Sequence, residues 1–306
     1  MGLITTKKIY MKMCHQSNNL YEMTDEERYA LQRHLVRMYA DIEKICVSHG
    51  LKVMLAYGSV LGAIRHGDVI PWDDDMDIYM PREDYELFIH EYSRELPDNY
   101  VVYAPNHTNG TITHFGKVVD KNTSFITPDS DSENFKFHKG VYVDIFPLDH
   151  IEPNKFTNQS RRLLIMVLKY IKGSVRQYVG NSMSYKIVMN GSPVAKFNYC
   201  LRQCIGFLMS FKTLDQWANM IDGISAFCKK ETGFYHDTSA WRYDVNPLPQ
   251  EMFFPPRKVK FGEIEAFVPN QAERYLERCY GDWRQIPSPE NRWRHFIVKL
   301  DLSKGM

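Results

Sequence analysis

The spacing of apolar residues predicts a mixed α/β unit over residues 24–150. Apolar positions recur at helical spacing over residues 31–45, after a capping box that begins at Thr24 and before Gly50, so this stretch is expected to form a helix of about six turns. A second helix is expected at 81–96, and short apolar runs typical of strands lie at 52–59, 75–80, 99–105, 113–120 and 140–149. Helices that alternate with strands in this way are typical of a mixed sheet with helices packed on it.

The pattern changes over residues 151–245, where long apolar stretches at helical spacing predict a second, helical unit. Between Pro153 and Leu214 the chain contains ten Lys or Arg and no Asp or Glu. Two interpretations stay open: a helical subdomain whose polar face is basic, or a surface that meets anionic lipid or a polyanionic acceptor. Residues 246–306 are expected to form a C-terminal segment with a hairpin and a helix, which packs back near the active site.

Composition and charge narrow the class of protein. A chain of 306 residues with 44% hydrophobic content can bury a large core. The net charge of +1 gives no overall sign of nucleic-acid binding, so no nucleic-acid partner is expected. Six scattered cysteines lack the spacing of a disulfide framework. No signal peptide is expected, because the N-terminal stretch has no sustained apolar run, and no window approaches the roughly 18 apolar residues of a membrane span. We therefore expect a cytoplasmic protein, or one bound peripherally to the inner face of the plasma membrane.

Four aspartates stand close together in this nearly neutral chain: Asp73, Asp74, Asp75 and Asp77. Apolar residues alternate with the acids over residues 76–80, which predicts a strand with one face in the core and argues against a solvated acidic loop. A calcium-binding EF-hand loop would need Gly at its sixth position and Glu at its twelfth, where this chain has Ile78 and Asp84. The repulsion among the acids must be offset, and a bound cation is the interpretation that we favour.

The expected cation ligands come from two strands. Asp75 and Asp77 are separated by one residue, so on a strand both face the same way and are able to bridge Mg²⁺ or Mn²⁺. Asp144 is the charged residue within an apolar run on a later strand, where a carboxylate is costly unless it is paired or bound to metal. These three acids are the predicted metal ligands and catalytic residues.

Residues upstream of the acids are candidates for substrate binding. Gly58 and Ser59 end the first predicted strand, where a tight turn before a helix would let a phosphate approach backbone N–H groups. Arg65 is able to pair with a phosphate or to form a surface salt bridge. Asp73 is expected either to contact metal through water or to fix its turn, and Asp74 is expected to be solvated or to support a ligand.

The longer string "GSVLGAIRHGDVIPWDDDMDIYMPREDY" closely resembles the signature of the LicD family, which includes bacterial phosphocholine transferases and, more distantly, the fukutin-related sugar-phosphate transferases. The C-terminal "YLERCYGDWRQIP" and "RWRHF" are similar to that family's closing motif, so the resemblance runs from about Leu31 to about Phe296. It implies a nucleotidyltransferase-like mixed-sheet core with a basic helical insertion and a C-terminal helical segment.

The resemblance also implies roles for residues. Asp75, Asp77 and Asp144 would hold two metal ions, Lys117 matches a family lysine and would contact a diphosphate, and His295 closes the family motif and would reach the site.

The implied reaction moves a phospho-alcohol, with phosphocholine as the leading expectation, from a CDP-alcohol donor to a sugar hydroxyl and releases CMP. The acceptor would be a cell-surface glycan, such as teichoic acid or lipopolysaccharide, or its lipid-linked precursor. Two alternatives stay open: a nucleotidyltransferase that attaches a nucleoside monophosphate to a small molecule or protein, and an inactive scaffold that binds glycan or membrane.

Overall fold

The computed structural model describes residues 20–111, 113–151, 154–190, 192–228, 230–237, 247–292 and 294–303. Within the predicted helical unit, positions 152–153, 191, 229 and 238–245 lie outside the described residues. The described part is a mixed sheet with helices packed against it, so the expected α/β fold class is confirmed.

The first half of the chain supplies most of the sheet. The first described helix begins at Asp25, and its N-cap Thr24 forms the predicted capping box with Glu27. Its apolar residues recur at helical spacing, so they form one stripe, and this stripe is buried. The elements are α2 (Asp25–Ser48), β1 (Met54–Leu55), α3 (Tyr57–His66), β2 (Asp77–Pro81), α4 (Arg82–Leu87), a π-helical turn (Phe88–Tyr92), a 3₁₀ turn (Ser93–Glu95), β3 (Tyr100–Tyr103), β4 (Gly116–Asp120), β5 (Ser124–Ile126) and β6 (Tyr142–His150).

The second half contains the predicted long helices and then the predicted hairpin and helix. The helices α5 and α7 have side-chain N-caps at Asn154 and Ser192, and Thr213 starts α8 with a capping box. The elements are α5 (Lys155–Gly180), α6 (Met183–Met189), α7 (Pro193–Met209), α8 (Leu214–Ser225), β7 (Phe234–His236), β8 (Leu248–Pro249), α9 (Gln250–Phe253), β9 (Arg257–Phe261), β10 (Ile264–Val268), α10 (Ala272–Tyr280), a 3₁₀ turn (Pro289–Asn291) and β11 (Lys299–Asp301).

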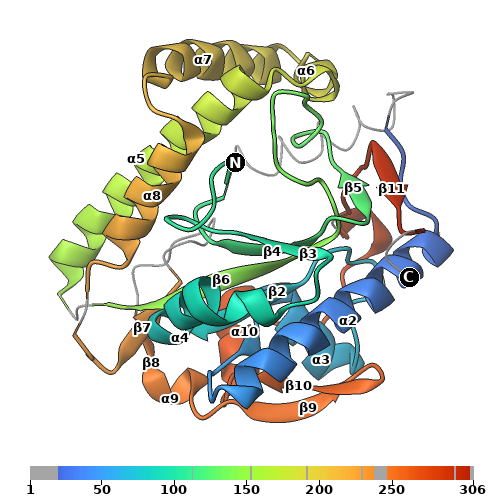
Figure 1. The fold of residues 1–306 in the computed structure, drawn as a ribbon, viewed down its shortest axis with the longest axis vertical. Helices are drawn as coiled ribbons and strands as arrows, with labels where there is room; N and C mark the ends of the chain where they lie inside the picture. Colours follow the sequence, from blue (N-terminus) through green and yellow to red (C-terminus); the bar gives the residue numbers. More distant parts are fainter. Residues whose placement is uncertain are drawn as a thin grey trace.

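The sheet has the order β1-β2-β6-β4-β3, and β7 and β8 extend it from β6. The neighbours β2 and β6 run parallel, whereas the other pairs are antiparallel. Figure 1 shows α2, α3 and α10 gathered on one side of the sheet and α5, α7 and α8 grouped on the other. The main core lies between the sheet and the first group, and a smaller core that includes Ile165 and Trp217 holds α5 against α8.

A buried arginine links the sheet to the helices α5, α7 and α8, which we call the helical group. Arg82 directly follows β2, and its Nε donates to Asp149 Oδ1 on β6 at 2.7 Å while Nη1 donates to Asp222 Oδ1 on α8 at 2.8 Å. Two buried carboxylates therefore share one guanidinium, whose planar fork suits such a bridge.

The structure corrects three local expectations around the acids. The first strand is only two residues long and α3 already begins at Tyr57, so Gly58 and Ser59 lie in the first helical turn instead of in a turn before it. Asp75 precedes β2 and is not part of the strand. Asp74 is 3% exposed, so the expectation of a solvated side chain was wrong, because a distant segment covers it.

Candidate active site

Three neighbouring strands set a row of charged side chains on one face of the sheet. Asp77 on β2 is the register partner of Asp144 on β6, and Asp144 is in turn the partner of Lys117 on β4. Register partners project to the same face of a sheet. Lys117 Nζ lies 2.8 Å from Asp144 Oδ1 and 3.1 Å from the ring centroid of Tyr142, so its charge is held over the acids.

A side chain of α2 holds the loop that carries residues 73–75. Gln32 on α2 donates its side-chain amide to the carbonyl oxygens of Ile70 at 3.0 Å and of Asp73 at 2.8 Å. These two bonds fix the turn from which the acids project. Nothing in the local sequence singles out Gln32 for this role, and sequence reasoning missed it.

The start of α3 packs against the same loop. A Cβ on Gly58 would lie 3.0 Å from Asp73 Oδ2, so glycine permits a close approach between the helix and that carboxylate. The buried Ser59 accepts the Asp77 N–H through its Oγ at 3.0 Å and so fastens the start of β2 to α3. Gly58 and Ser59 are thus brought to the acids, as contacts of Asp73 and Asp77.

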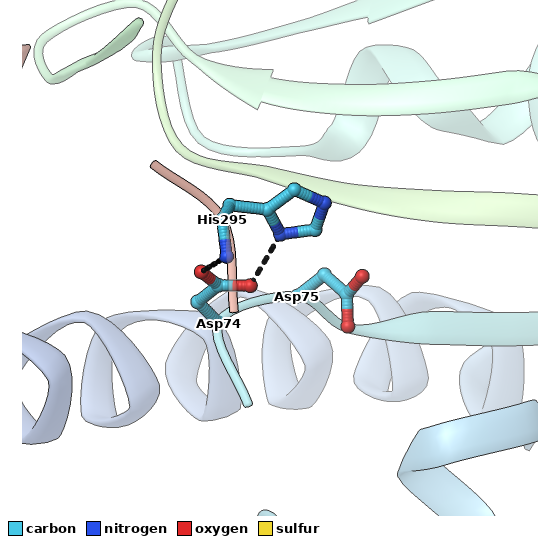
Figure 2. Close-up of side chains that lie close together, drawn as sticks. All are labelled: Asp74, Asp75 and His295. Atoms are coloured by element: carbon cyan, nitrogen blue, oxygen red, sulfur yellow. Dashed lines mark hydrogen bonds and ion pairs between the residues drawn. The ribbon is translucent and has the colours of Figure 1, made fainter. Parts of the chain in front are cut away.

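The C-terminal segment closes over the loop. His295 Nδ1 lies 2.6 Å from Asp74 Oδ1, and the His295 N–H donates to Asp74 Oδ2 at 3.2 Å. Figure 2 shows this pair with the Asp75 carboxylate beside it. Asp74 was not among the predicted site residues, although its place in the aspartate cluster was a signal for it.

Arg65 contributes to the same closure. Its Nη1 donates to the carbonyl oxygens of Trp283 at 2.8 Å and of Gln285 at 3.4 Å. The Arg292 guanidinium lies 4.3 Å from the ring centroid of Trp72. These contacts hold Trp283, Gln285 and Arg292 against α3 and the loop, and they direct the charge of Arg65 to the C-terminal segment.

Burial and mutual repulsion raise the pKa values of the clustered carboxyls. Burial raises the pKa of Asp77 well above its usual range, and Asp75 and Asp144 raise it further. Burial likewise raises the pKa of Asp73, with Asp75 and Asp74 adding to the effect. For Asp144 burial raises the pKa and the Lys117 ammonium opposes it. The cluster holds more negative charge than its own cations offset, which is the condition under which a divalent cation binds.

A second group of possible metal ligands includes His295. In the described residues, one group of three ligand-type side chains has its donor atoms within 4.8 Å of one another, and it consists of Asp74, Asp75 and His295. Burial lowers the pKa of His295, but Asp74 and Asp75 outweigh this and raise it to about 10. A protonated imidazole is a counter-ion and does not bind metal. Without a bound cation His295 is therefore a counter-ion to Asp74 and Asp75, and in its neutral form it would be a third ligand-type group beside them.

A cavity of about 240 Å³ opens beside the row of charges. Its lining includes Lys117, Tyr142, Asp144 and His295, together with Arg176 from α5. A small anionic molecule in this space would meet Lys117, Lys139, Arg176 and His295 next to the acid cluster. The site therefore combines carboxylates that are able to hold cations with basic groups that are able to hold phosphate.

Comparison with known proteins relates this site to a family. Residues 50–163 match the model of the LicD/FKTN/FKRP nucleotidyltransferase domain. The chain is 24% identical over 272 residues to the lipopolysaccharide cholinephosphotransferase LicD of Haemophilus influenzae, and the match covers 83% of this chain and 89% of that protein. It is 54% identical over 35 residues to the ribitol 5-phosphate transferase FKRP of Homo sapiens, which covers 11% of this chain and 7% of that protein.

The matched domain contains the three strands that carry Asp77, Lys117 and Asp144, the loop before β2 and the start of α3. The aspartate signature in the sequence predicted the same family. Residues 50–163 are therefore similar to the LicD/FKTN/FKRP nucleotidyltransferase domain, and the similarity to LicD over most of the chain supports the resemblance predicted from the sequence.

Proposed function

We propose that the protein transfers a phospho-alcohol, with phosphocholine as the first candidate, from a CDP-alcohol to a sugar hydroxyl and releases CMP. The similarity to a lipopolysaccharide cholinephosphotransferase over most of both chains supports a phosphotransferase that acts on a cell-surface glycan or its lipid-linked precursor. The observation that carries the proposal is the register that sets Asp77 beside Asp144 and Lys117. Such a row offers carboxylates and a cation where a diphosphate would react.

The proposed metal ligands are Asp75, Asp77 and Asp144, which would hold Mg²⁺ or Mn²⁺, as two ions. Carboxylate oxygens are the ligands that these hard cations prefer, and the raised pKa values of the three carboxyls reflect charge that a cation would neutralise. When bound, the ions would offset the charge of the diphosphate during displacement at phosphorus. Asp144 would also accept the proton of the attacking hydroxyl.

The proposed substrate contacts surround these acids. Lys117 and His295 line the cavity beside Asp144, which supports a role for both as positive charges toward the diphosphate. Gly58 would offer its N–H group in the first turn of α3 to a phosphate. Ser59 would offer its hydroxyl, because its N–H already donates to the Ala56 carbonyl oxygen at 2.9 Å.

Asp73 and Arg65 are also proposed substrate contacts, and both already contact other parts of the protein when no substrate is bound. Asp73 would contact metal through water or keep its turn in place beside Gly58. Arg65 would reach a phosphate only by exchanging its bond to the Trp283 carbonyl oxygen.

The proposal is tested by donor binding, which is detected as a rise in the melting temperature of the protein. CDP-choline, CDP-ethanolamine, CDP-glycerol, CDP-ribitol and ATP are compared with and without Mg²⁺. We expect one CDP-alcohol to raise the melting temperature in a Mg²⁺-dependent way, and Asp75→Asn to abolish the shift. The exposed Asp98→Asn is the matched control and should keep the shift.

Asp77→Asn should lower turnover by roughly a hundredfold or more, because it removes charge stabilisation at the reacting phosphate. Stabilisation by ATP and by no cytidine compound would overturn phospho-alcohol transfer.

A nucleotidyltransferase reaction is the second candidate, because the matched family model is described as a nucleotidyltransferase domain. The same carboxylates would serve attack at the inner phosphorus of a nucleoside triphosphate. Product analysis separates the two reactions, since phospho-alcohol transfer releases CMP and nucleotidyl transfer releases pyrophosphate. An inactive scaffold is disfavoured, because a scaffold gains nothing from buried carboxylates that repel one another.

We also propose that the helical group contacts an anionic membrane from the cytoplasmic side. Across the described helices, none combines the length and apolar character that spanning a bilayer requires. Exposed apolar side chains on α5 and α7 accompany the basic charge of this region, among them Phe156, Leu163, Val194, Phe197, Phe207 and Leu208.

Five cysteines in the described residues are free thiols, which supports a reducing compartment.

A further inference from the structure

A second cavity, of about 540 Å³, lies among the helices α5, α6 and α7. We call it the helical cavity. Its volume is in the range of small-molecule sites, which spans roughly 300–1,000 Å³. Three tyrosines from the three helices line it, Tyr170, Tyr185 and Tyr199, and amide side chains such as Gln177 and Asn198 lie between them. Aromatic faces beside hydrogen-bonding amides suit a sugar ring, which has apolar C–H faces and a rim of hydroxyls.

Polar atoms in the wall of the helical cavity lack partners. In the described part of the chain, Gln177 Oε1 and Arg176 Nε are buried without a hydrogen-bond partner. The other end of the Gln177 amide donates to the Tyr185 hydroxyl at 2.7 Å, so its orientation is fixed. A buried polar atom without a partner costs about 1–3 kcal/mol. Both atoms are covered by neighbouring atoms, so a ligand would reach them only after those neighbours move.

The charge of the helical cavity is positive. The Arg202 guanidinium on α7 lies 4.3 Å from the ring centroid of Tyr170 on α5. A Cβ on Gly173 would approach Arg202 Nη1 to 3.1 Å, so glycine gives the guanidinium its place against α5. The acid among the lining residues is Asp129, and it already pairs with Arg176 at 2.7 Å. The charge of Arg202 is therefore available to an anionic ligand.

The helical cavity adjoins the cavity beside the acid cluster. Asp129 and Arg176 line both spaces, whereas Lys117 and Asp144 line only the smaller one. The two spaces therefore meet at the Asp129–Arg176 pair, and a ligand bound among the helices would have to pass this pair to bring a hydroxyl to Asp144. This is the path that an attacking sugar hydroxyl would need.

We propose that the helical cavity binds the acceptor as a saccharide that carries a phosphate or another anionic group, with Arg202 and the tyrosines as its main contacts. This inference rests on the proposed function only for the role of the ligand as acceptor. The site itself is tested without turnover.

The binding experiment uses protein labelled with ¹³C at the methionine methyl groups, because Met189 lines the helical cavity. Its signal is assigned with Met189→Leu and followed during titration with glucose 6-phosphate, glucose or inorganic phosphate. We expect a saturable shift with the tightest binding for glucose 6-phosphate. Arg202→Gln should weaken that binding about tenfold, as expected for loss of one charge-assisted contact. Lys196→Gln, an exposed change on α7 outside the cavity, should leave it unchanged.

Three results would overturn the inference: no shift of the Met189 signal, equal affinity of Arg202→Gln and the unchanged protein, or binding of phosphate alone as tight as that of the sugar phosphate. The donor-induced thermal shift is measured on the same samples. Its absence in the unchanged protein would end the proposed function, while a saturable Met189 signal would still establish the saccharide site. In the active enzyme, Arg202→Gln should raise KM for the acceptor and leave donor binding intact.

Discussion

At the scale of single residues, the pair of Asp74 and His295 offsets part of the negative charge of the acid cluster. Asp74 is almost completely buried, and its partner comes from a position 221 residues away. Because Asp74 and Asp75 together outweigh the effect of burial, the pKa of His295 rises to about 10 and the imidazole is protonated at neutral pH. The C-terminal segment therefore carries a positive charge onto the loop before β2.

This pair predicts a pH dependence of stability. The folded-state pKa of His295, about 10, lies above the unfolded value of about 6.5, so its stabilisation is fully present below about pH 6.5 and is lost as pH rises toward 10. We expect the unfolding free energy, measured by urea denaturation in a chelator, to fall across this window by at most a few kcal/mol more than in His295→Gln. Parallel profiles for the two proteins would contradict a charged His295.

At the scale of elements, the close approach of α3 to the loop before β2 shapes the site. Gly58 lies in the first turn of α3, and its backbone faces the Asp73 carboxylate. Ser59, one residue on, bonds the Asp77 backbone. One helical turn therefore positions two of the aspartates, so a small displacement of this turn would move the carboxylates themselves.

Alanine substitutions at two helical glycines test this coupling. Gly→Ala in a helix ordinarily stabilises by up to about 1 kcal/mol. Gly223→Ala on α8 should show this gain, because a Cβ there meets nothing within 4 Å. Gly58→Ala should gain less or lose stability, because its Cβ lies 3.0 Å from Asp73 Oδ2 and the carboxylate must move, and it should also lower donor turnover. Urea denaturation and turnover are measured for both, and equal behaviour of the two variants would refute the coupling.

At the scale of the whole molecule, the acid cluster and the helical group lie on connected parts of one fold. Arg82 joins β2 and β6 to α8, and the Asp129–Arg176 pair joins the two cavities. The helices α5 and α7 lie at the outside of the fold (Figure 1). They combine exposed apolar side chains with basic charge. A membrane held at these helices would bring a lipid-linked acceptor close to the helical cavity.

Vesicle binding tests the membrane contact. We expect sedimentation with vesicles of phosphatidylglycerol at low salt, weaker binding at high salt because the charges are screened, and little binding to phosphatidylcholine. The double variant Phe197→Ser with Leu208→Ser should lower the partition coefficient roughly tenfold or more, since each apolar side chain contributes about 1.5–3 kcal/mol when buried. Ile286→Ser, an exposed apolar residue away from the helices, is the control. Absence of binding together with dimerisation through α7 would show that a second copy covers this face.

Local elements and the resemblance to the LicD family were predictable from the order of the residues alone. The capping box at Thr24 and the apolar spacing predicted α2, the basic helical region was visible from charge and periodicity, and the signature around Asp75 and Asp77 predicted the LicD/FKTN/FKRP family. These features depend on residues close together in the chain, whose spacing sets helix faces and strand faces directly. The α/β class follows from the order of such elements.

Contacts between distant residues depend on how the elements pack. Strand register brought Lys117 to Asp144 and Asp77, and the return of the C-terminal segment buried Asp74 under His295. The helical cavity also exists only because three separate helices pack together. Contacts of this kind depend on the packing of whole elements against one core, so no pattern of neighbouring residues specifies them, and they set the burial and charge on which the chemistry of the site depends.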